Sequence, residues 1–410
     1  MASAAASPKA ELVLDRAGIT PPRERADGTG QPGGSALGWA RQYWHGRRVL
    51  DPAWPAGPGS VVVEGLSPGT SYEVIARAEG VEPFVAARIT TLRRPRGDLL
   101  YRFATVSDLH IGETTFGIAK RIHDALEPAP STGRPPGRST SAAQDRAGTE
   151  LCATYPVRSL RAAIEESAAW GAQLLVAKGD LTDVTRPAEV RDVACVLSES
   201  PVPVEAVLGN HDNRTGVDIR ALLEARGIIV PWQPRALDVP GLRLVLASTA
   251  HRNLGYHRGQ FPPEATRRVA ALAAEIKGPV WVGLHHPPER WPFPTVYPPG
   301  IPFSQGRALL DELASANRAA FVSCGHRHRN RRHSYGPIPI TEVGSTKDYP
   351  GVWAGYKVFE EGILQVVRRT ARPDVIAWTE ATRRAMNGQW GRWSPGRLRD
   401  RCFTHDWPAR

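Results

Sequence analysis

Short apolar runs alternate with amphipathic segments from about residue 99 onward. The apolar runs are brief and rich in valine and leucine, and they predict strands at 99–106, 173–177, 202–208, 242–247, 280–284, 319–324 and 338–343. The segments between them repeat apolar residues every three or four positions and predict helices at 157–170, 188–197, 217–224 and 264–276. This alternation is typical of an α/β domain in which helices cover a sheet.

The pattern before residue 98 is different, because turns rich in glycine and proline separate strand-like runs that lack helical periodicity. We expect a flexible segment at 1–35, a β-sandwich-like domain at 36–97 and an α/β domain at 98–370. Within the second of these, strands are expected at 61–63, 72–76 and 84–92. A β-hairpin at 356–368 and a C-terminal helical extension at 371–410 complete the expected organisation.

One stretch, 113–157, interrupts the alternation and contains no clear sheet element. Its middle is rich in proline, serine and glycine. Loops of this length inside compact domains are usually either functional or disordered. We therefore interpret 113–157 as an insertion that either acts as a lid or is disordered in its middle.

Five polar clusters follow the predicted strands, each directly after an apolar run. They are Asp108-Leu-His110, Gly179-Asp180, Gly209-Asn210-His211-Asp212, His285-His286-Pro287 and Gly325-His326-Arg327-His328. The carboxyl edge of the sheet is where α/β proteins bind ligands. We therefore expect carboxylates, an amide and imidazoles from five chain segments to converge at this edge.

These side chains offer oxygen and imidazole nitrogen donors, and no cysteine is among them. Such a mixed set suits iron, manganese, zinc or cobalt better than it suits calcium or a structural zinc. A carboxylate can bridge two ions, and Asp180 is the candidate for that position. Any one cluster could instead be a turn with a surface histidine, but the ordered set of five favours one metal centre.

Composition narrows the remaining classes of function. The 410-residue chain carries a formal charge of +11, mostly from arginine, which either attracts anionic substrates or reflects an arginine-rich composition. We expect no nucleic-acid partner, because no basic run is regularly interleaved with aromatic residues. No apolar stretch approaches the ~20 residues that span a bilayer, so no membrane partner is expected. Four widely spaced cysteines and the lack of a secretory signal favour a cytoplasmic protein.

The ordered series D-x-H, GDxxD, GNHD, HHP and GHxH resembles the calcineurin-like metallophosphoesterases over residues 100–345. The resemblance implies a four-layer α/β/β/α sandwich and a dinuclear metal-dependent phosphoric ester hydrolase. It implies that one metal ion is held by Asp108, His110, Asp180 and His328, and the other by Asp180, Asn210, His285 and His326. In this family the ligand follows its strand directly, so His285 is the expected ligand and His286 is expected to orient one by a hydrogen bond.

The same resemblance implies a mechanism. Two ions about 3.5–4 Å apart would clamp a phosphoryl oxygen, and a bridging hydroxide would attack phosphorus in line. His211 occupies the family's position for assisting the leaving group, and Asp212 is expected to orient its ring. Acid–base assistance of this kind contributes about 10²–10⁴ in rate.

The wording of the motifs is similar to that of bacterial class III cyclic-nucleotide phosphodiesterases, which favours a small phosphodiester as substrate. The alternatives are a phosphomonoesterase for a small phosphorylated metabolite and a non-catalytic scaffold. The scaffold is disfavoured because every ligand position is filled. Purple acid phosphatases are also similar, but they have a tyrosine where Asp183 stands, which argues against an iron–tyrosinate centre.

Two further expectations concern the N-terminal domain and the substrate. The stretch LSPGTSYEV at 66–74 resembles a turn of fibronectin type III domains, in which the hydroxyl of Tyr72 would bond to the turn backbone. Candidate substrate-binding residues are Arg327, His257 and His286, and a small anionic phosphoester is the expected partner. The oligomeric state is left open.

Overall fold

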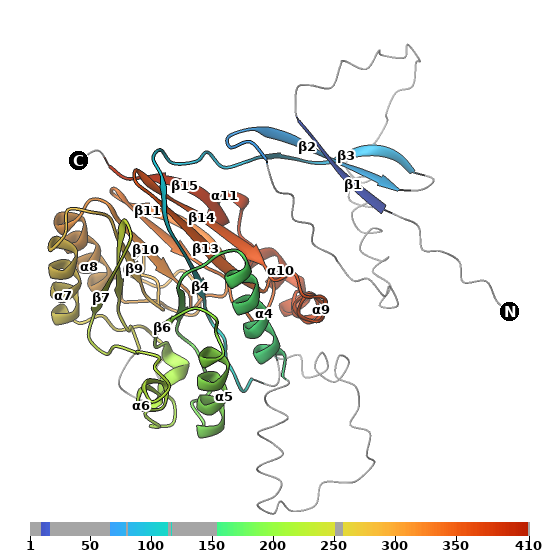
Figure 1. Ribbon diagram of the computed structural model, residues 1–410. Coiled ribbons are helices and arrows are strands. Elements are labelled where there is room, and N and C mark those ends of the chain that lie inside the picture. Colours follow the sequence, from blue (N-terminus) through green and yellow to red (C-terminus); the bar gives the residue numbers. More distant parts are fainter. Residues whose placement is uncertain are drawn as a thin grey trace, which may run out of the picture. The chain divides into compact units, whose positions relative to one another are not determined.

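The computed structural model describes residues 10–16, 66–78, 81–113, 116, 154–250 and 257–408. The chain divides into two compact units, Met1–Arg94 and Pro95–Arg410, which are described separately (Figure 1). The strand expected at 61–63 and most of the insertion expected at 113–157 lie outside the described residues.

The N-terminal unit contains an antiparallel sheet in the order β1–β2–β3, with the bounds Ala10–Arg16, Ser71–Ala78 and Val81–Thr90. The backbone N–H of Ser67 donates to the Tyr72 hydroxyl at 3.0 Å and closes the turn before β2. Ala10–Arg16, which falls within the segment 1–35 that was expected to be flexible, forms a strand whose central apolar run pairs with β2. The fibronectin-like identity of this unit stays a prediction.

The larger unit is built around two six-stranded sheets. The first has the order β15–β14–β13–β4–β5–β6, with parallel pairing from β4 to β6 and antiparallel pairing elsewhere. Its strands are Leu99–Val106 (β4), Leu175–Lys178 (β5), Val204–Val207 (β6), Val352–Phe359 (β13), Gly362–Arg369 (β14) and Cys402–Asp406 (β15). Since β4, β5 and β6 are parallel, their carboxyl ends meet at one edge.

The second sheet has the order β11–β12–β10–β9–β8–β7 and is parallel except at its two edge strands. Its strands are Arg235–Val239 (β7), Leu242–Leu246 (β8), Val280–Gly283 (β9), Ala320–Cys324 (β10), Arg331–Tyr335 (β11) and Ile338–Glu342 (β12). Neither β7 nor β11 was expected from the sequence, because these edge strands are only partly buried and lack a continuous apolar run.

Helices cover the outer face of each sheet, so the larger unit has four layers, α/β/β/α (Figure 1). The first sheet is covered by α4 (Tyr155–Ala169), α5 (Pro187–Ser198) and α6 (Ile219–Glu224). The second is covered by α7 (Pro263–Ala274) and α8 (Phe303–Ala316). This arrangement confirms the fold class that the resemblance implied.

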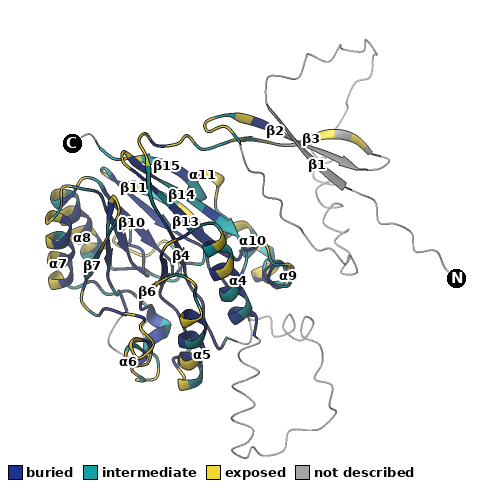
Figure 2. Cartoon of the chain, viewed as in Figure 1, coloured by how far each residue is buried: buried dark blue, intermediate teal, exposed yellow. Residues whose placement is uncertain are grey.

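The inner faces of the two sheets meet in a core of large apolar side chains. Phe103 stacks on Tyr356 with ring centroids 4.6 Å apart, and Trp281 meets Phe103 edge to face at 5.3 Å. All three are fully buried, as is most of the interior of this unit (Figure 2). Burying a side chain of this size stabilises the fold by roughly 2–3 kcal/mol, so this core fixes the strand ends of one sheet relative to those of the other.

The C-terminal segment 371–410 is not only a helical extension. It does contain α9 (Pro373–Thr382), the turn η2 (Met386–Gly388) and the short helices α10 (Trp390–Trp393) and α11 (Leu398–Arg401). However, β15 pairs antiparallel with β14 and forms the edge of the first sheet. Its short polar sequence, CFTHD, gives no strand pattern. Within the described part of the chain, no helix combines the length and apolar composition needed to cross a bilayer.

Candidate metal centre

Loops that leave the carboxyl ends of strands in both sheets bring the polar clusters together. The loops after β4, β5 and β6 come from the first sheet, and those after β9 and β10 come from the second. In chain order they carry Asp108, His110, Asp180, Asn210, His285, His326 and His328. The expected convergence of five separate segments is therefore seen in the structure.

The backbone is strained at several of these residues. Positive φ angles are found at Asp108 (54°), His110 (43°), Asp180 (48°), His326 (70°) and His328 (47°). Residues other than glycine adopt this region rarely, at a cost of the order of 1–3 kcal/mol each. Strain concentrated on side chains that face one another indicates that these loops aim their side chains at a common point at the expense of stability.

Glycines within the clusters allow the loops to approach closely. A Cβ atom at Gly209 would collide with Asp180, and one at Gly179 would stand 2.6 Å from His285 Nδ1. A Cβ atom at Gly325 would collide with the Ser107 hydroxyl. The glycine of each GD, GN and GH pair is thus required for packing, whereas the residue after it supplies the polar group.

The first cluster consists of Asp108, His110 and His328, whose potential ligand atoms lie within 4.8 Å of one another. The Nε2 atoms of His110 and His328 face each other at 3.2 Å, and Asp108 Oδ1 is 3.6 Å from His328 Nε2. Two imidazole nitrogens bound to one ion at ordinary bond lengths and angles stand about 3–3.4 Å apart. The spacing therefore fits two ligands of a single ion.

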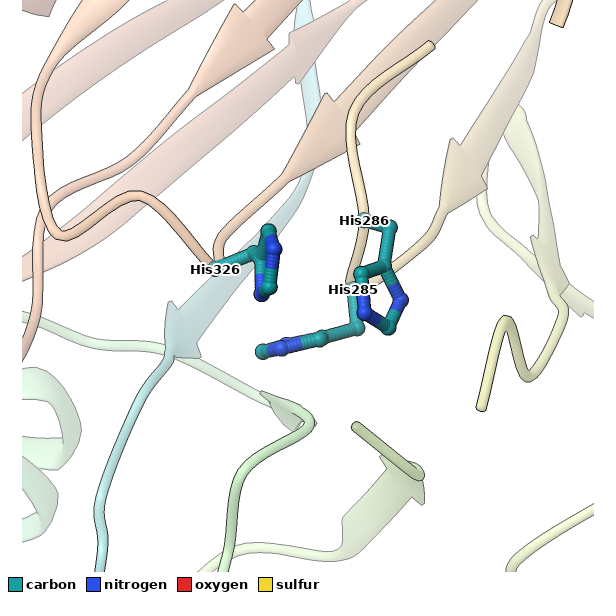
Figure 3. A group of neighbouring side chains, drawn as sticks. All are labelled: His285, His286 and His326. Carbon is teal, nitrogen blue, oxygen red and sulfur yellow. The ribbon is translucent and has the colours of Figure 1, made fainter. Parts of the chain in front are cut away.

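The second cluster contains His285, His286 and His326, which converge from the loops after β9 and β10 (Figure 3). His285 Nδ1 donates to the Lys178 carbonyl at 2.8 Å, so its Nε2 is left as the lone-pair nitrogen. His326 Nε2 donates to the Pro299 carbonyl at 3.1 Å, which leaves Nδ1. The nitrogens that remain are the ones that could hold a metal ion.

Asp180 stands between the two clusters. Its Oδ2 is 3.6 Å from His110 Nε2 in the first cluster and 3.2 Å from His285 Nε2 in the second. Its Oδ1 accepts the backbone N–H of His211 at 2.8 Å, which fixes the carboxylate. Burial lowers the pKa of His285, but the charges of Asp180 and Asp108 and the hydrogen bonds to Asp180 and Lys178 together outweigh burial and raise that pKa to about 9. A cation between these two side chains would take the place of the proton.

Three buried atoms of these side chains have no hydrogen-bond partner among the described residues, namely Asp108 Oδ2, His285 Nε2 and His326 Nδ1. An unsatisfied buried polar atom costs about 1–3 kcal/mol. Asp108 Oδ2 and His326 Nδ1 carry lone pairs, His285 Nε2 would carry one once a cation replaces its proton, and all three atoms belong to the two clusters. Coordination to cations would remove this cost, so the residues present fit a pair of metal ions.

His286 is buried, and both of its ring nitrogens are engaged. The Thr249 hydroxyl oxygen accepts a hydrogen bond from the His286 backbone N–H at 3.0 Å. The same hydroxyl donates to His286 Nδ1, with Oγ1 and Nδ1 2.7 Å apart. The ring proton then lies on Nε2, which donates to Asn210 Oδ1 at 3.1 Å. His286 therefore orients the Asn210 amide. The expectation that it contacts substrate is wrong, because the ring is fully buried and already bonded on both sides.

His328 is supported by a buried chain of charges that no sequence motif indicated. Its Nδ1 donates to Asp348 Oδ2 at 2.6 Å, and Lys347 Nζ lies 3.3 Å from the same oxygen and also pairs with Glu113. The Trp390 indole donates to Asp348 Oδ1 at 3.2 Å. Burial raises the pKa of Asp348, but His328 and Lys347 outweigh burial and hold it well below its usual value. A carboxylate behind a ligand imidazole fixes its orientation and increases its basicity.

His211 lies beside the first cluster, with its ring edge-on to that of His110 at a centroid distance of 4.3 Å. Its Nδ1 donates to the Asp183 carbonyl at 2.6 Å, so Nε2 is the nitrogen available for chemistry. Burial lowers the pKa of His211, but Asp180 and Asp183 outweigh burial and raise it above its ordinary value.

Asp212 does not orient the His211 ring, and that expectation is wrong. Its carboxylate accepts the backbone N–H groups of Gly209 and Thr182, each at 2.9 Å, and closes the 3₁₀ turn η1 (Asn210–Asn213). Burial together with the nearby charge of Asp180 raises the pKa of Asp212 to about 6. The residue shapes the loop that carries Asn210 and His211.

Arg327 was expected to bind substrate, and the structure contradicts this. Its side chain is buried, with Nη2 donating to Glu289 Oε1 at 2.6 Å and Nε to the Pro298 carbonyl at 3.1 Å. Arg329 is similarly paired with Glu342 at 2.6 Å. Buried charges need such partners, so these arginines hold the loops together and are not free to grip a phosphate.

His257 is the third expected substrate residue, and it is exposed near His211, with ring centroids 6.3 Å apart. Arg214 contacts both rings, since its Nη2 is 2.8 Å from His211 Nε2 and 3.3 Å from His257 Nδ1. Sequence reasoning missed Arg214, although its place directly after the GNHDN run could have indicated it.

The sandwich and its two clusters agree with a comparison against protein families. The model of the calcineurin-like phosphoesterase family matches residues 101–330, more than half of the chain. The chain belongs to this family. It is therefore a metal-dependent phosphoesterase, which is a hydrolase, as the motifs implied.

Solved structures with a similar fold have low sequence identity to this chain. A purple acid phosphatase, PPD1, from yellow lupin (Lupinus luteus) seeds is 11% identical, covers 78% of this chain and 63% of its own, and has a TM-score of 0.43. GAP50, described as the anchor in the inner membrane complex of Plasmodium, is 15% identical and has a TM-score of 0.43. The match covers 76% of this chain and 90% of GAP50. This chain thus spans less than two thirds of the lupin phosphatase. The comparison with curated proteins found no match.

Proposed function

We propose that this protein is a dinuclear metal-dependent phosphodiesterase that hydrolyses a small phosphodiester. The main observation in its support is that Asp180 Oδ2 lies near a ring nitrogen of each cluster, 3.6 Å from His110 Nε2 and 3.2 Å from His285 Nε2. A single carboxylate shared by two clusters supports a pair of ions. When bound, such a pair binds the oxygens of a phosphoryl group and activates a water for in-line attack.

In this proposal each ion has four protein ligands and both share Asp180. The two sets are Asp108, His110, Asp180 and His328, and Asp180, Asn210, His285 and His326. His286 donates to the amide oxygen of Asn210 and so fixes its orientation. Burial lowers the pKa values of His110 and His326 well below their ordinary value, which keeps these imidazoles in the neutral state that ligation requires. Oxygen and imidazole donors suit ions of the iron, manganese and zinc class.

His211 assists departure of the leaving group. Its Nδ1 is held by the Asp183 carbonyl, so Nε2 is the atom that can pass a proton to the departing oxygen. Such assistance is worth about 10²–10⁴ in rate when the leaving group is a poor one, such as an alkoxide. Asp183, which supplies the backbone carbonyl that holds this ring, stands where purple acid phosphatases have the tyrosine of their iron–tyrosinate centre.

The protein loaded with Mn²⁺ should hydrolyse bis(p-nitrophenyl) phosphate with a higher kcat/KM than p-nitrophenyl phosphate. If the protein hydrolyses only the monoester, the diesterase proposal is rejected in favour of the alternative, a phosphatase for a small phosphorylated metabolite. Metal content measured by elemental analysis on the same preparation should approach two ions per chain, and a preparation without bound metal and without turnover would reject both activities.

The His211→Ala variant separates the role of His211 from that of the metal ligands. We expect kcat to fall about 10²–10⁴-fold for a diester with an alkyl leaving group, and much less for one with p-nitrophenol, which leaves without a proton. His405→Ala, in β15, is the matched control and should retain both activities. Equal losses on both substrates would show that His211 does not act on the leaving group.

A further inference from the structure

Arg214 differs from the other arginines near the metal centre. Arg327 and Arg329 are buried and paired with glutamates, whereas Arg214 is half-buried and contacts two imidazoles. Among the residues that the structure describes, no carboxylate lies within ion-pair distance of its guanidinium. A guanidinium that lies near a phosphoester site and has no anionic partner there is a candidate for binding an anionic group of the substrate.

The contacts of Arg214 are with acceptors that can be exchanged. A guanidinium only donates, so His211 Nε2 and His257 Nδ1 each accept from Nη2, at 2.8 Å and 3.3 Å. A charged oxygen is a stronger acceptor for arginine than a neutral ring nitrogen and can be bound by two parallel N–H groups. An anionic substrate group would therefore displace these nitrogens.

The position of Arg214 defines which part of the substrate it would meet. A ring nitrogen of His211 lies within 4.8 Å of ligand atoms of both Asp180 and His110. Nε2 of that ring is the atom placed to protonate the leaving group, and the Arg214 guanidinium stands beside it. His257, which contacts the same Nη2 atom, is exposed, so the group that Arg214 would bind can extend toward solvent.

We propose that Arg214, beside the exposed His257, forms an anion-binding subsite on the leaving-group side of the metal centre, so that the preferred substrate carries a second phosphate or a carboxylate on its leaving group. This inference rests on the proposed phosphodiesterase function and narrows its substrate class. When the anion binds, Arg214 moves its hydrogen bonds from the imidazoles to the anionic oxygens.

Binding of two small phosphonates to the Mn²⁺-loaded full chain tests the subsite without turnover. Phosphonoacetate carries a carboxylate where the leaving group would be, and ethylphosphonate does not. Calorimetry should show tighter binding of phosphonoacetate to the wild type. Arg214→Gln should reduce this preference about tenfold to a hundredfold, as expected for loss of a hydrogen bond between charged groups, and Arg214→Lys should reduce it less.

The controls distinguish a subsite from other roles of Arg214. Arg220→Gln, at an arginine of α6 that packs over Trp232, should keep the wild-type preference. Chelation of Mn²⁺ by phosphonoacetate is the same in every preparation, so it cancels when variants are compared. The proposal is overturned if the wild type shows no preference or if Arg214→Gln weakens both phosphonates equally. Turnover of bis(p-nitrophenyl) phosphate on the same samples tests the proposed function separately, because its failure leaves the binding preference measurable.

Discussion

The two candidate metal-binding clusters use similar side chains but are supported in different ways. In the first cluster, the His328 imidazole rests on the carboxylate of Asp348, which is itself part of a buried charge network. In the second cluster, His285 and His326 donate to backbone carbonyl groups. The Asn210 amide is oriented by the neutral imidazole of His286, which is held by the Thr249 hydroxyl. One cluster is therefore backed by charge and the other by neutral dipoles.

This difference shows how two ions in nearly equivalent ligand sets can acquire different affinities. A carboxylate behind an imidazole increases the electron density at the ligand nitrogen more than a carbonyl does. The first cluster should therefore hold its ion more tightly, and the second should release its ion first. Asp180 belongs to both clusters, so it limits how independent the two affinities can be.

The largest effect is expected from Asp180→Asn, which removes the charge that the clusters share. Metal stabilisation of the transition state is worth several kcal/mol, so we expect kcat/KM to fall by about 10³ or more and bound metal to fall below two ions per chain. Activity on a diester and metal content by elemental analysis are the measurements.

Asp218→Asn is the matched control for this change, since Asp218 is an exposed carboxylate that caps α6 by accepting the Arg220 N–H. It should retain both ions and full activity. An Asp180→Asn enzyme with two tightly bound ions and more than a tenth of wild-type activity would show that the clusters do not depend on a common carboxylate.

A smaller effect, confined to one cluster, is expected from Asp348→Asn. The amide keeps the size of the side chain but removes the charge behind His328, so affinity for the first-cluster ion should fall about 10–100-fold. Titration with a chelator should release ions from the wild type in two steps, and the two steps should merge in the variant.

The assignment of the steps needs variants of each cluster. His326→Ala should remove the earlier step, and His328→Ala the later one. Asp311→Asn, at an exposed carboxylate of α8, should leave both steps unchanged. If Asp348→Asn instead shifts the earlier release step to a lower chelator concentration, the first cluster, which is backed by charge, binds its ion more weakly than the second. The comparison is then reversed.

The candidate ligands could be predicted from sequence because each follows an apolar strand and the residue types are restricted by metal chemistry. Their supports could not be. Asp348 follows β12 and Thr249 follows β8, and neither belongs to a motif. Their contacts with His328 and His286 depend on how the strands of the two sheets are ordered, which the pattern of apolar residues does not reveal.

The errors of sequence reasoning have a similar cause. Arg327 lies between two candidate ligands in the GHRH run, and its side chain is directed instead to Glu289. Asp212 is adjacent to His211 in sequence, but the turn η1 directs its carboxylate to backbone N–H groups. Neighbouring residues in a motif thus have different orientations, and the motif shows which side chains are present without showing where each one points.

The smallest effect is expected from Thr249→Val, which keeps the shape of the side chain and removes its hydroxyl. Without that hydroxyl at Nδ1, the His286 proton is no longer fixed on Nε2, and the Asn210 amide loses part of its orientation. A hydrogen bond of this kind contributes about 0.5–1.5 kcal/mol, so affinity for the second-cluster ion should fall about threefold to tenfold. Affinity for the first-cluster ion, which His328 would help to hold, should not change. The chelator titration that separates the two ions measures this, with Thr266→Val in α7 as the buried-threonine control. A shift of the later release step would mean that the two clusters are coupled through more than Asp180.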